Sequence, residues 1–262
     1  MRNTKVFLRD KNIIKKIIDS AKLTSKDVII EIGSGEGVLT EEIAKIAKKV
    51  YAIEYDLNLL DASKMRLSTF DNIVFVHGDA LEIDFPEDAN KIMSNLPYAI
   101  SSPITEKIVY FLNRKPGSIA ILMYQKEFAD RMMAFPSMSD YSMLSVFCQY
   151  SCNIKKITPV SKKAFRPVPS IDSMVLEIMP KNVKIDRGFL AFCHSIFQHK
   201  KKNLYSAIMD SRRDLAVKDK EKLREALGYV KGDILKEKVF MFEIGELVSI
   251  YEEMLKLKIC QK

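Results

Sequence analysis

The segment Asn95-Leu96-Pro97-Tyr98 combines residue types that can hold and activate an aromatic amine. It follows a short apolar run, Lys91 to Ser94, which is typical of the end of a buried strand. The amide oxygen of Asn95 accepts a hydrogen bond, the backbone carbonyl of Leu96 accepts another, and the ring of Tyr98 offers a flat face. Pro97 fixes the backbone of this turn and removes one donor from it. Together these groups predict a site for a flat exocyclic amine, and adenine N6 is the obvious candidate.

A glycine-rich loop lies upstream, between a predicted strand and a predicted helix. Residues 31 to 37 are Glu-Ile-Gly-Ser-Gly-Glu-Gly. Glycines at such a turn let the backbone approach a ligand closely, at the sheet end where open α/β folds bind nucleotides. The pattern is shared by many nucleotide binders and can also mark only a tight turn. No Lys-Ser or Lys-Thr pair follows it, so a loop of the P-loop type is disfavoured.

Two acidic residues at the ends of the next predicted strands make the prediction of a nucleoside-binding site more specific. Glu54 closes the second strand, 17 residues after Gly37, where a carboxylate can accept hydrogen bonds from both ribose hydroxyls of a nucleoside. Asp79 follows the third strand and can accept a hydrogen bond from an adenine amino group. Either carboxylate alone is typical of an exposed loop. In this order along the chain, ahead of Asn95, they predict a slot for an adenosine moiety.

These motifs need a framework that brings several strand ends together. Compact β-branched runs alternate with stretches of helical period, which predicts right-handed crossovers and a mostly parallel sheet. The predicted parallel strands cover 28–32, 50–54, 73–76, 91–94 and 119–124. Two further segments, 150–159 and 171–179, have no helix of adequate length between them and are expected to pair antiparallel. The sequence therefore predicts an α/β fold with a doubly wound, mostly parallel, seven-stranded sheet.

Beyond residue 180 the apolar pattern becomes helical. Predicted helices cover 189–199, 202–211, 218–227 and 244–257. We therefore expect a catalytic domain over residues 1–182 and a small all-α domain over residues 183–262.

A stiff loop, Phe165-Arg166-Pro167-Val168-Pro169, lies between the two antiparallel segments. Its prolines restrict the backbone and hold the phenylalanine in place. Tyr98 and Phe165 are our candidates for stacking on the two faces of a base that leaves its own stack. For each ring, packing in the core is the alternative.

The net charge of +8 is placed unevenly along the chain. Between residues 181 and 262 there are 18 Lys or Arg against 12 Asp or Glu. Such a surplus favours a polyanionic partner such as RNA, although each basic cluster can equally be a solvated face. The candidate RNA contacts are Lys200, Lys201, Lys202, Arg212, Arg213, Lys162 and Lys163.

Several other classes of protein are disfavoured by composition. The four cysteines form no CxxC pair and the three histidines have no metal-like spacing, so neither a disulfide framework nor a metal site is expected. The apolar stretches are shorter than the roughly 20 residues that a membrane span needs, and no secretory segment opens the chain. We expect a cytoplasmic protein.

The motifs together resemble the ribosomal RNA adenine dimethyltransferase family, and within it the KsgA/Dim1 branch that modifies the small subunit. The resemblance covers nearly the whole chain, and Asn-Leu-Pro-Tyr followed by Ile-Ser-Ser-Pro at residues 100–103 is its most specific element. It implies a Rossmann-like methyltransferase fold that uses S-adenosylmethionine, releases S-adenosylhomocysteine and acts as a monomer. It also implies dimethylation of N6 on two adjacent adenosines in the 3′-terminal hairpin loop of small-subunit ribosomal RNA, with a small-subunit precursor as partner.

The resemblance assigns roles to individual residues. The glycine loop would hold the methionine end of the cofactor, Glu54 its ribose, and Asp79 with Ala80 its adenine. Asn95, Leu96, Pro97, Tyr98 and Phe165 would be catalytic. The implied cofactor contacts are Val6, Leu8, Glu31, Gly33, Ser34, Gly35, Gly37, Glu54, Tyr55, Asp79, Ala80 and Asn95.

The chain departs from the family pattern at three positions. Lys5 replaces a glutamine of the N-terminal motif that helps to roof the cofactor, Ser142 replaces a frequent glycine, and Ile171 replaces the usual valine. The first departure puts the contacts of that roof in question.

Three alternatives stay open at this point. The fold could serve a ribosome-assembly factor that binds RNA and has lost catalysis, although intact Glu54, Asp79 and Asn95 argue against it. An enzyme acting on large-subunit ribosomal RNA shares most of these motifs. A DNA adenine methyltransferase is less suited, because such enzymes typically have proline where this chain has Leu96.

Overall fold

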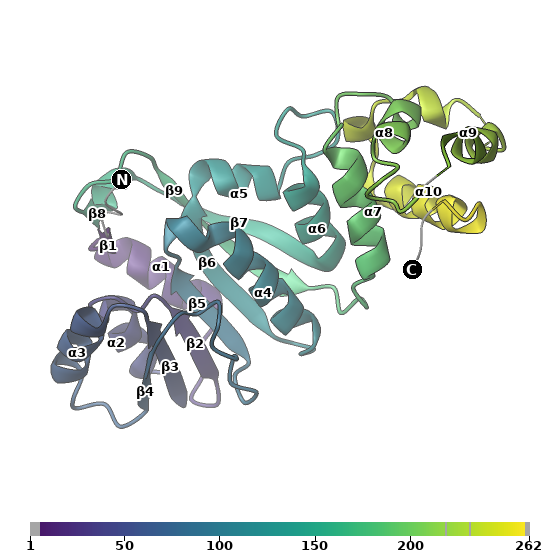
Figure 1. Cartoon of the computed structure of the whole chain (residues 1–262). Coiled ribbons are helices and arrows are strands. Elements are labelled where there is room, and N and C mark those ends of the chain that lie inside the picture. Colours follow the sequence, from purple (N-terminus) through teal and green to yellow (C-terminus); the bar gives the residue numbers. More distant parts are fainter. Residues whose placement is uncertain (1–5, 218, 231, 260–262) are drawn as a thin grey trace. The chain divides into compact units, whose positions relative to one another are not determined.

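Fully buried β-branched runs form the centre of a seven-stranded sheet in the computed structural model, which describes residues 6–217, 219–230 and 232–259 (Figure 1). The strand order is β4-β3-β2-β5-β6-β9-β7; the first five of these are parallel and β9 is antiparallel to both of its neighbours. The bounds are β2 Val28–Ile32, β3 Lys49–Glu54, β4 Ile73–His77, β5 Lys91–Asn95, β6 Ile119–Gln125, β7 Cys152–Val160 and β9 Ser173–Pro180. The predicted α/β fold with a mostly parallel sheet is confirmed.

Helices connect the parallel strands, as the alternating pattern predicts. These are α2 Val38–Ala44, α3 Leu57–Arg66 and α4 Ser101–Asn113, whereas α1 Lys11–Ala21 precedes β2 and β4 passes to β5 without an α-helix. Local sequence explains where they begin: the side chain of Asp10 caps α1 by accepting hydrogen bonds from two backbone amides, and Asp56 caps α3 in the same way. The buried face of α1 carries Ile14, Ile17 and Ala21, which are spaced for one side of a helix.

Strand order places the predicted motifs at one edge of the sheet. The chain passes from β2 outward through β3 to β4 and then returns to β5 on the other side of β2. Such a reversal opens a crevice at the carboxyl ends of the parallel strands. The glycine loop, Glu54, Asp79 and Asn95 all follow or close strands there.

A two-stranded sheet near this edge was not predicted. β1 (Phe7–Leu8) pairs antiparallel with β8 (Phe165–Arg166), with Leu8 opposite Phe165. The backbone amide of Arg9 also donates to the carbonyl of Ala164 at 2.8 Å. This pairing ties the described N-terminal segment to the proline loop.

The described residues fall into two compact units: the first consists of those within 6–129 and 151–183, and the second, which is mainly helical, of those within 130–150 and 184–259. Residues 130–150 thus pack with the C-terminal helices, whereas the sequence prediction assigned them to the first domain. Tyr141 explains this, because its buried hydroxyl donates to the carbonyl of Phe242 at 3.1 Å. The helices are α6 Met143–Ser151, α7 Arg187–Phe197, α8 Leu204–Asp210, α9 Lys220–Gly228 and α10 Ile244–Lys256, and α5 Lys126–Met132 crosses the division after Ala129.

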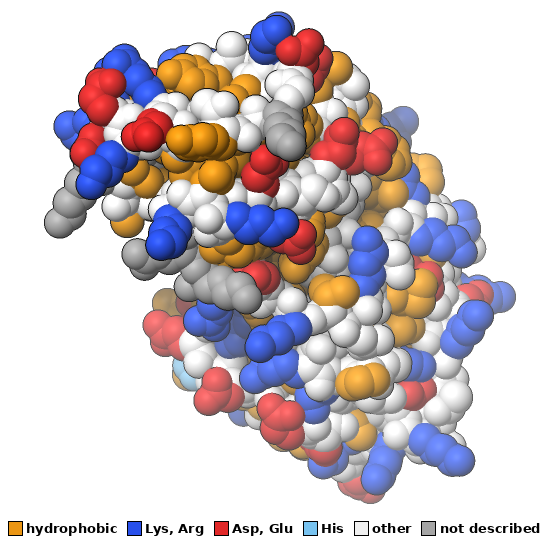
Figure 2. Space-filling model, turned by 90° about the vertical axis from the view of Figure 1, so that its right-hand side faces the viewer, with side chains coloured by type: hydrophobic (Ala, Val, Ile, Leu, Met, Phe, Trp, Pro, Cys, Tyr) orange, Lys and Arg blue, Asp and Glu red, His pale blue; other side chains and the backbone are white. Residues whose placement is uncertain are grey.

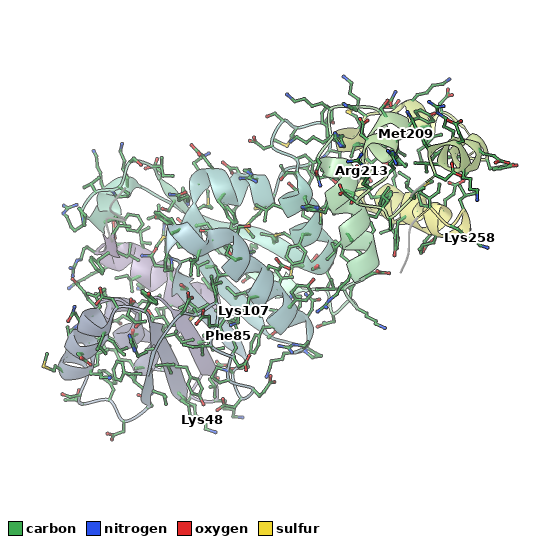
Figure 3. All side chains as sticks on the ribbon, viewed as in Figure 1. Lys48, Phe85, Lys107, Met209, Arg213 and Lys258 are labelled. Carbon is green, nitrogen blue, oxygen red and sulfur yellow. The ribbon has the colours of Figure 1, made fainter. Side chains whose placement is uncertain are left out.

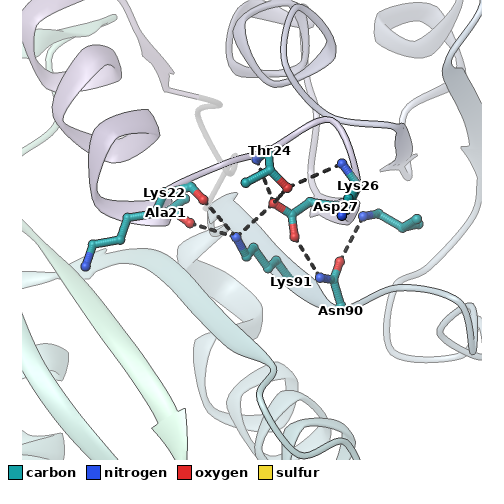
Figure 4. Close-up of polar contacts among 8 residues, drawn as sticks. Ala21, Lys22, Thr24, Lys26, Asp27, Asn90 and Lys91 are labelled. Atoms are coloured by element: carbon teal, nitrogen blue, oxygen red, sulfur yellow. Dashed lines mark hydrogen bonds and ion pairs between the residues drawn. The ribbon is translucent and has the colours of Figure 1, made fainter.

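A polar cluster around the buried Asp27 fixes the amino ends of β2 and β5 (Figure 4). Lys91 donates to Asp27 at 3.0 Å and to the carbonyls of Ala21 and Lys22 at 3.0 and 3.1 Å. Asn90 donates to Asp27 at 2.7 Å and accepts from the backbone amide of Val28 at 2.8 Å. Burial acts to raise the pKa of Asp27, but the hydrogen bonds from Asn90 and Lys91 outweigh it and hold the pKa below its ordinary value of 3.8.

Replacing Lys91 by methionine should therefore lower the free energy of unfolding by about 1.5–3 kcal/mol at pH 7, because a buried carboxylate loses a charged donor. Asp27 has a depressed pKa, so its contribution is present above pH 3.8 and is lost as pH falls through the folded value. The deficit of the variant should shrink accordingly between pH 7 and pH 3 in urea unfolding. Lys49→Met, which breaks an exposed pair with Asp88, is the control and should cost less than about 1 kcal/mol. Equal losses in the two variants would contradict this account.

Candidate active site

A cavity of about 560 Å³ lies at the carboxyl edge of the sheet, within the first unit. It is lined by segments that follow four neighbouring parallel strands and by the described N-terminal residues. Of the predicted contacts, the structure brings together Val6, Leu8, Glu31, Gly33, Ser34, Gly35, Glu54, Tyr55, Asp79, Ala80, Asn95, Leu96, Pro97 and Tyr98. One cavity thus collects residues that are spread over more than ninety positions of the sequence.

Glu54 organises the glycine loop from the end of β3. Its carboxylate is 7% exposed and accepts hydrogen bonds from the backbone amides of Gly35 and Asp56, both at 2.9 Å. The amides of Gly33 and Ser34 donate to the carbonyl of Ile53 at 2.8 and 3.1 Å. The loop is therefore held against β3 by its own backbone, and its path around the cavity is fixed.

The glycine loop also touches the Asn-Leu-Pro-Tyr segment. Gly33 has a φ of +69°, a conformation that side chains rarely adopt, and a Cβ there would lie 2.9 Å from Cγ of Pro97. Glycine is therefore required for two reasons at this position. This close approach places the glycine loop against the segment that carries Asn95.

Asn95 lines this cavity and carries a buried acceptor. Its Oδ1 atom is buried and has no hydrogen-bond partner among the described residues. The backbone amide of Leu96 donates to the carbonyl of Met123 at 3.3 Å, which anchors the next residue to β6. Buried amide oxygens without partners are costly, so this one marks a position where a donor from a ligand would be stabilising.

Tyr98 is fixed by its hydroxyl group. The hydroxyl hydrogen bonds with Oγ of Ser173 at 2.7 Å, and the half-buried ring lines the cavity. Burial raises the pKa of Tyr98, so its hydroxyl stays neutral at physiological pH. The ring can act as a rigid flat face there.

Glu31 supplies a buried acid beneath the glycine loop. It is 2% exposed, and its Oε2 atom has no hydrogen-bond partner among the described residues. Burial raises the pKa of Glu31 to about 8, and the nearby charge of Glu54 adds to this. The hydroxyl of Ser34 is likewise buried without a partner in the part of the chain that the structure describes. Both atoms are suited to a ligand with polar or cationic groups.

The sequence did not predict the role of Lys107, which secures the loop that carries Asp79 and Ala80. This α4 lysine donates to the carbonyls of Ala80 at 2.8 Å and Leu81 at 3.0 Å, and also to that of Ile83. Its ammonium lies 4.7 Å from the ring centroid of Phe85, and the two residues are labelled in Figure 3. Asp79 accepts a hydrogen bond from the amide of Leu81 at 2.8 Å, so the lysine and the aspartate hold the same loop. No motif in the sequence signals such a contact.

Replacing Lys107 by methionine should weaken binding of S-adenosylhomocysteine about tenfold, because the loop that carries Asp79 and Ala80 loses a charged donor. Lys107→Arg keeps the charge and should restore part of the affinity. Lys115→Met is the control, since Lys115 also lies over a ring, that of Phe111 at 5.0 Å, but donates to Glu87 and not to the loop that carries Asp79 and Ala80. Isothermal titration measures all three. Equal affinities for the Lys107→Met and Lys115→Met variants would remove Lys107 from the site.

Two predicted site residues do not line the cavity. Gly37, with φ +77°, immediately precedes α2, and a Cβ there would meet Ser63 of α3 and Leu67 just after it, so the glycine serves helix packing. Phe165 is fully buried in the main hydrophobic core, where its strand pairs with Leu8. The prediction that Phe165 stacks on a base is wrong for this structure, because neither face of the ring is accessible.

None of the three departures from the family pattern is found among the described residues that line the cavity. Lys5 lies outside the described residues. Ser142 precedes α6 in the second unit, and Ile171 precedes β9; neither lines the cavity.

The predicted basic residues differ in their surroundings. Lys200 donates to the carbonyls of Ser139 and Tyr141 at 2.8 and 2.7 Å, which gives it a structural role. Lys202 pairs with Asp210 at 2.7 Å, and Lys201 is exposed. Lys162 and Lys163 are exposed in the first unit. On the face drawn in Figure 2, Lys and Arg side chains are interspersed with Asp and Glu, so charge alone singles out no RNA site there.

Within residues 6–217, 219–230 and 232–259, no helix has both the length and the apolar character needed to cross a bilayer. In the same residues, no cluster of three or more His, Cys, Asp or Glu side chains is arranged to hold a metal ion.

Comparison with protein families gives a match over most of the chain. The model of the ribosomal RNA adenine dimethylase family matches residues 2–243. A protein of Methanococcus maripaludis strain C5, named "Probable ribosomal RNA small subunit methyltransferase A", is 41% identical over 257 residues, which cover 94% of this chain and 96% of that protein. A protein of Methanosphaera stadtmanae with the same name is 42% identical over 252 residues, 94% and 91% of the two chains.

Two solved structures extend the likeness to three dimensions. A dimethyladenosine transferase from Plasmodium falciparum superposes with a TM-score of 0.84 at 27% identity, covering 96% of this chain and 98% of that one. The 23S rRNA methyltransferase ErmE superposes with a TM-score of 0.65 at 25% identity, covering 94% and 98%.

Proposed function

The chain belongs to the ribosomal RNA adenine dimethylase family, and on that premise we propose that it dimethylates N6 of two adjacent adenosines in the 3′-terminal hairpin loop of small-subunit ribosomal RNA. The observation that carries the proposal is the buried Oδ1 of Asn95, which has no hydrogen-bond partner among the described residues and belongs to a side chain that lines the same cavity as Glu54, Asp79 and the glycine loop. We place this reaction in the cytoplasm, on a precursor of the small subunit, with the enzyme acting as a monomer.

The residues present fit S-adenosylmethionine, the methyl donor of this family. Glu54 would hold the ribose, Asp79 and Ala80 the adenine, and the glycine loop the methionine end. The buried oxygens of Glu31 and Ser34 without partners are suited to the polar methionine group. When bound, the cofactor supplies an electrophilic methyl group on a sulfonium and leaves as S-adenosylhomocysteine.

The protein groups then have to make a poor nucleophile reactive. The lone pair of the adenine amine is delocalised into the ring. Oδ1 of Asn95 and the carbonyl of Leu96 would each accept one amino hydrogen and so direct the lone pair toward the methyl carbon. Tyr98 would stack on the base and hold it in plane. Holding the two reactants in line is worth roughly 7–11 kcal/mol, and the displaced proton leaves afterwards to water.

The raised pKa of Glu31 gives a prediction for cofactor binding. At pH 7 the acid is mostly protonated in the free protein, because its pKa is about 8. An ammonium group beside it favours the ionised form, so binding should release about one proton. Calorimetric titrations in buffers of different ionisation enthalpy measure this release. Glu31→Gln should abolish it, and proton release that persists in this variant would place the titrating group elsewhere.

A second target is favoured by one observation only. The likeness to ErmE leaves large-subunit RNA as an alternative substrate, although its TM-score of 0.65 is lower than the 0.84 of the dimethyladenosine transferase. A chain that binds subunits without methylating them would be an assembly factor.

One experiment separates these functions. Purified protein is incubated with unmethylated small or large subunits and isotopically labelled S-adenosylmethionine, and the digested RNA is analysed by mass spectrometry. Label in dimethyladenosine of the small subunit supports the proposal. Label only in large-subunit RNA, or subunit binding without label, would overturn it.

A further inference from the structure

The second compact unit contains a cavity of its own, of about 490 Å³, between α8 and α9. Tyr205, Met209 and Asp210 line it from α8, Lys220 and Arg224 from α9, and Arg212 and Arg213 from the segment between the helices. Met209 and Arg213 are labelled beside α8 in Figure 3. A hollow of this size accommodates a small ligand or one residue of a larger one.

The charge of this cavity selects an anion. Four of its lining side chains are cationic and one is a carboxylate, Asp210. That carboxylate is neutralised from outside the cavity, because it accepts a hydrogen bond from Lys202 at 2.7 Å, which also holds its pKa below the ordinary value. Arg224 pairs with Glu221 at 2.8 Å, but the glutamate side chain is 75% exposed, so this pair is weak. Guanidinium groups are the side chains best suited to phosphate.

A flat apolar surface lies beside these cations. Tyr205 and Met209 are four residues apart on α8 and so share one face of the helix. The Tyr205 side chain is 36% exposed, which leaves its ring accessible from the cavity. An aromatic face next to phosphate-binding arginines is the arrangement that holds a base of a single-stranded nucleic acid.

We propose that this cavity binds an unpaired nucleotide of the RNA, with its phosphate at Arg213 and Arg224 and its base against Tyr205. The inference rests on the proposed function, because it gives the RNA substrate a second contact on the C-terminal unit. The proposed nucleotide site shares no residue with the catalytic cavity, and its test measures RNA binding and not methyl transfer.

The test measures binding of a fluorescent single-stranded oligoribonucleotide to the full chain over a range of salt concentrations. The double variant Arg213→Ala/Arg224→Ala should bind roughly tenfold more weakly and lower the slope of log K against log salt by roughly 0.7, because it loses the one phosphate contact that the two arginines share. The control is Lys222→Ala/Lys236→Ala, which removes the same charge from exposed positions of the same unit that do not line the cavity. The control should retain most of the affinity and slope, and thermal unfolding checks that both variants fold.

The base contact has its own pair of variants. Tyr205→Leu should weaken binding about fivefold or more without changing the salt slope, because stacking is lost and charge is kept, whereas Tyr205→Phe should bind like the natural chain.

Three results would overturn the proposal. They are equal salt slopes in the arginine and lysine double variants, unchanged binding by Tyr205→Leu, and binding of a poly-glutamate peptide as tight as that of the oligonucleotide. Methyl transfer is not the readout. A chain that fails to methylate can therefore still show this site, and a methylating chain can fail to show it.

Discussion

Replacing Asn95 by alanine should lower kcat by about two to three orders of magnitude and leave RNA binding nearly unchanged. Asn95 lines the cavity, and its buried Oδ1 atom has no hydrogen-bond partner among the described residues. We therefore expect this atom to accept a hydrogen bond from a ligand in the cavity. The hydrogen bond to this acceptor becomes stronger as the amine attacks the methyl group. Its loss therefore raises the free-energy barrier of the chemical step and leaves the affinity for the substrate nearly unchanged. Single-turnover methylation with saturating cofactor measures this effect.

Asn95→Asp provides the control for that variant. An aspartate keeps an acceptor oxygen at the same position, so its loss of turnover should be smaller than that of the alanine variant. Cofactor affinity and RNA affinity are measured beside it for both proteins. Turnover by Asn95→Ala within about threefold of the natural chain would remove this residue from the mechanism.

Replacing Glu54 by alanine should weaken cofactor binding by about a hundredfold or more. Its carboxylate accepts hydrogen bonds from the amides of Gly35 and Asp56, so the variant loses the order of the glycine loop as well as the proposed ribose contact. Each hydrogen bond to a charged acceptor is worth about 1.5–3 kcal/mol, and 1.4 kcal/mol corresponds to a tenfold change in affinity. Titration with S-adenosylhomocysteine measures the loss, and kcat at saturating cofactor should stay close to normal.

Glu36→Ala is the matched control for Glu54→Ala. Glu36 is also a carboxylate on the cavity wall, but it pairs with Arg9 at 2.6 Å and is 33% exposed. Its removal takes away the same charge with little expected effect on affinity. Similar losses in the two variants would show that the site responds to charge and not to a specific contact at Glu54.

The sequence predicted the sheet because its strands carry an unmistakable pattern. Runs such as 28–32 and 119–124 are almost entirely apolar and largely buried, and helical periods separate such runs. Their parallel order brings the strand ends to one edge, so the grouping of Glu54, Asp79 and Asn95 in one cavity could be predicted without coordinates.

The features that could not be predicted from the sequence depend on contacts between distant residues, which leave no local pattern in the sequence. β1 and β8 have two residues each, too few for any periodicity, and only their pairing shows why Phe165 is buried. Gly37 illustrates a second limit, because a glycine that packs against α3 and a glycine that admits a ligand look alike in sequence. Lys107 meets carbonyls 24 to 27 positions away in the chain, and nothing in its neighbours indicates that.

The second unit shows a third limit. Residues 130–150 carry an apolar helix that could cover a sheet or join other helices, and periodicity does not distinguish the two. Likewise, the basic surplus of the C-terminal third predicted a polyanion but not which cations bind it. Lys200 and Lys202 are engaged within the fold, whereas Arg213 and Arg224 line a cavity.

A crystal structure of the protein with S-adenosylhomocysteine and an adenosine-containing oligonucleotide tests the central claim most directly. The account predicts the cofactor product between Glu54 and Asp79, and the adenine N6 within hydrogen-bonding distance of Oδ1 of Asn95 and the carbonyl of Leu96. An adenine bound away from Asn95 and Leu96, or a cofactor product bound outside the cavity that Glu54 and Asp79 line, would contradict it.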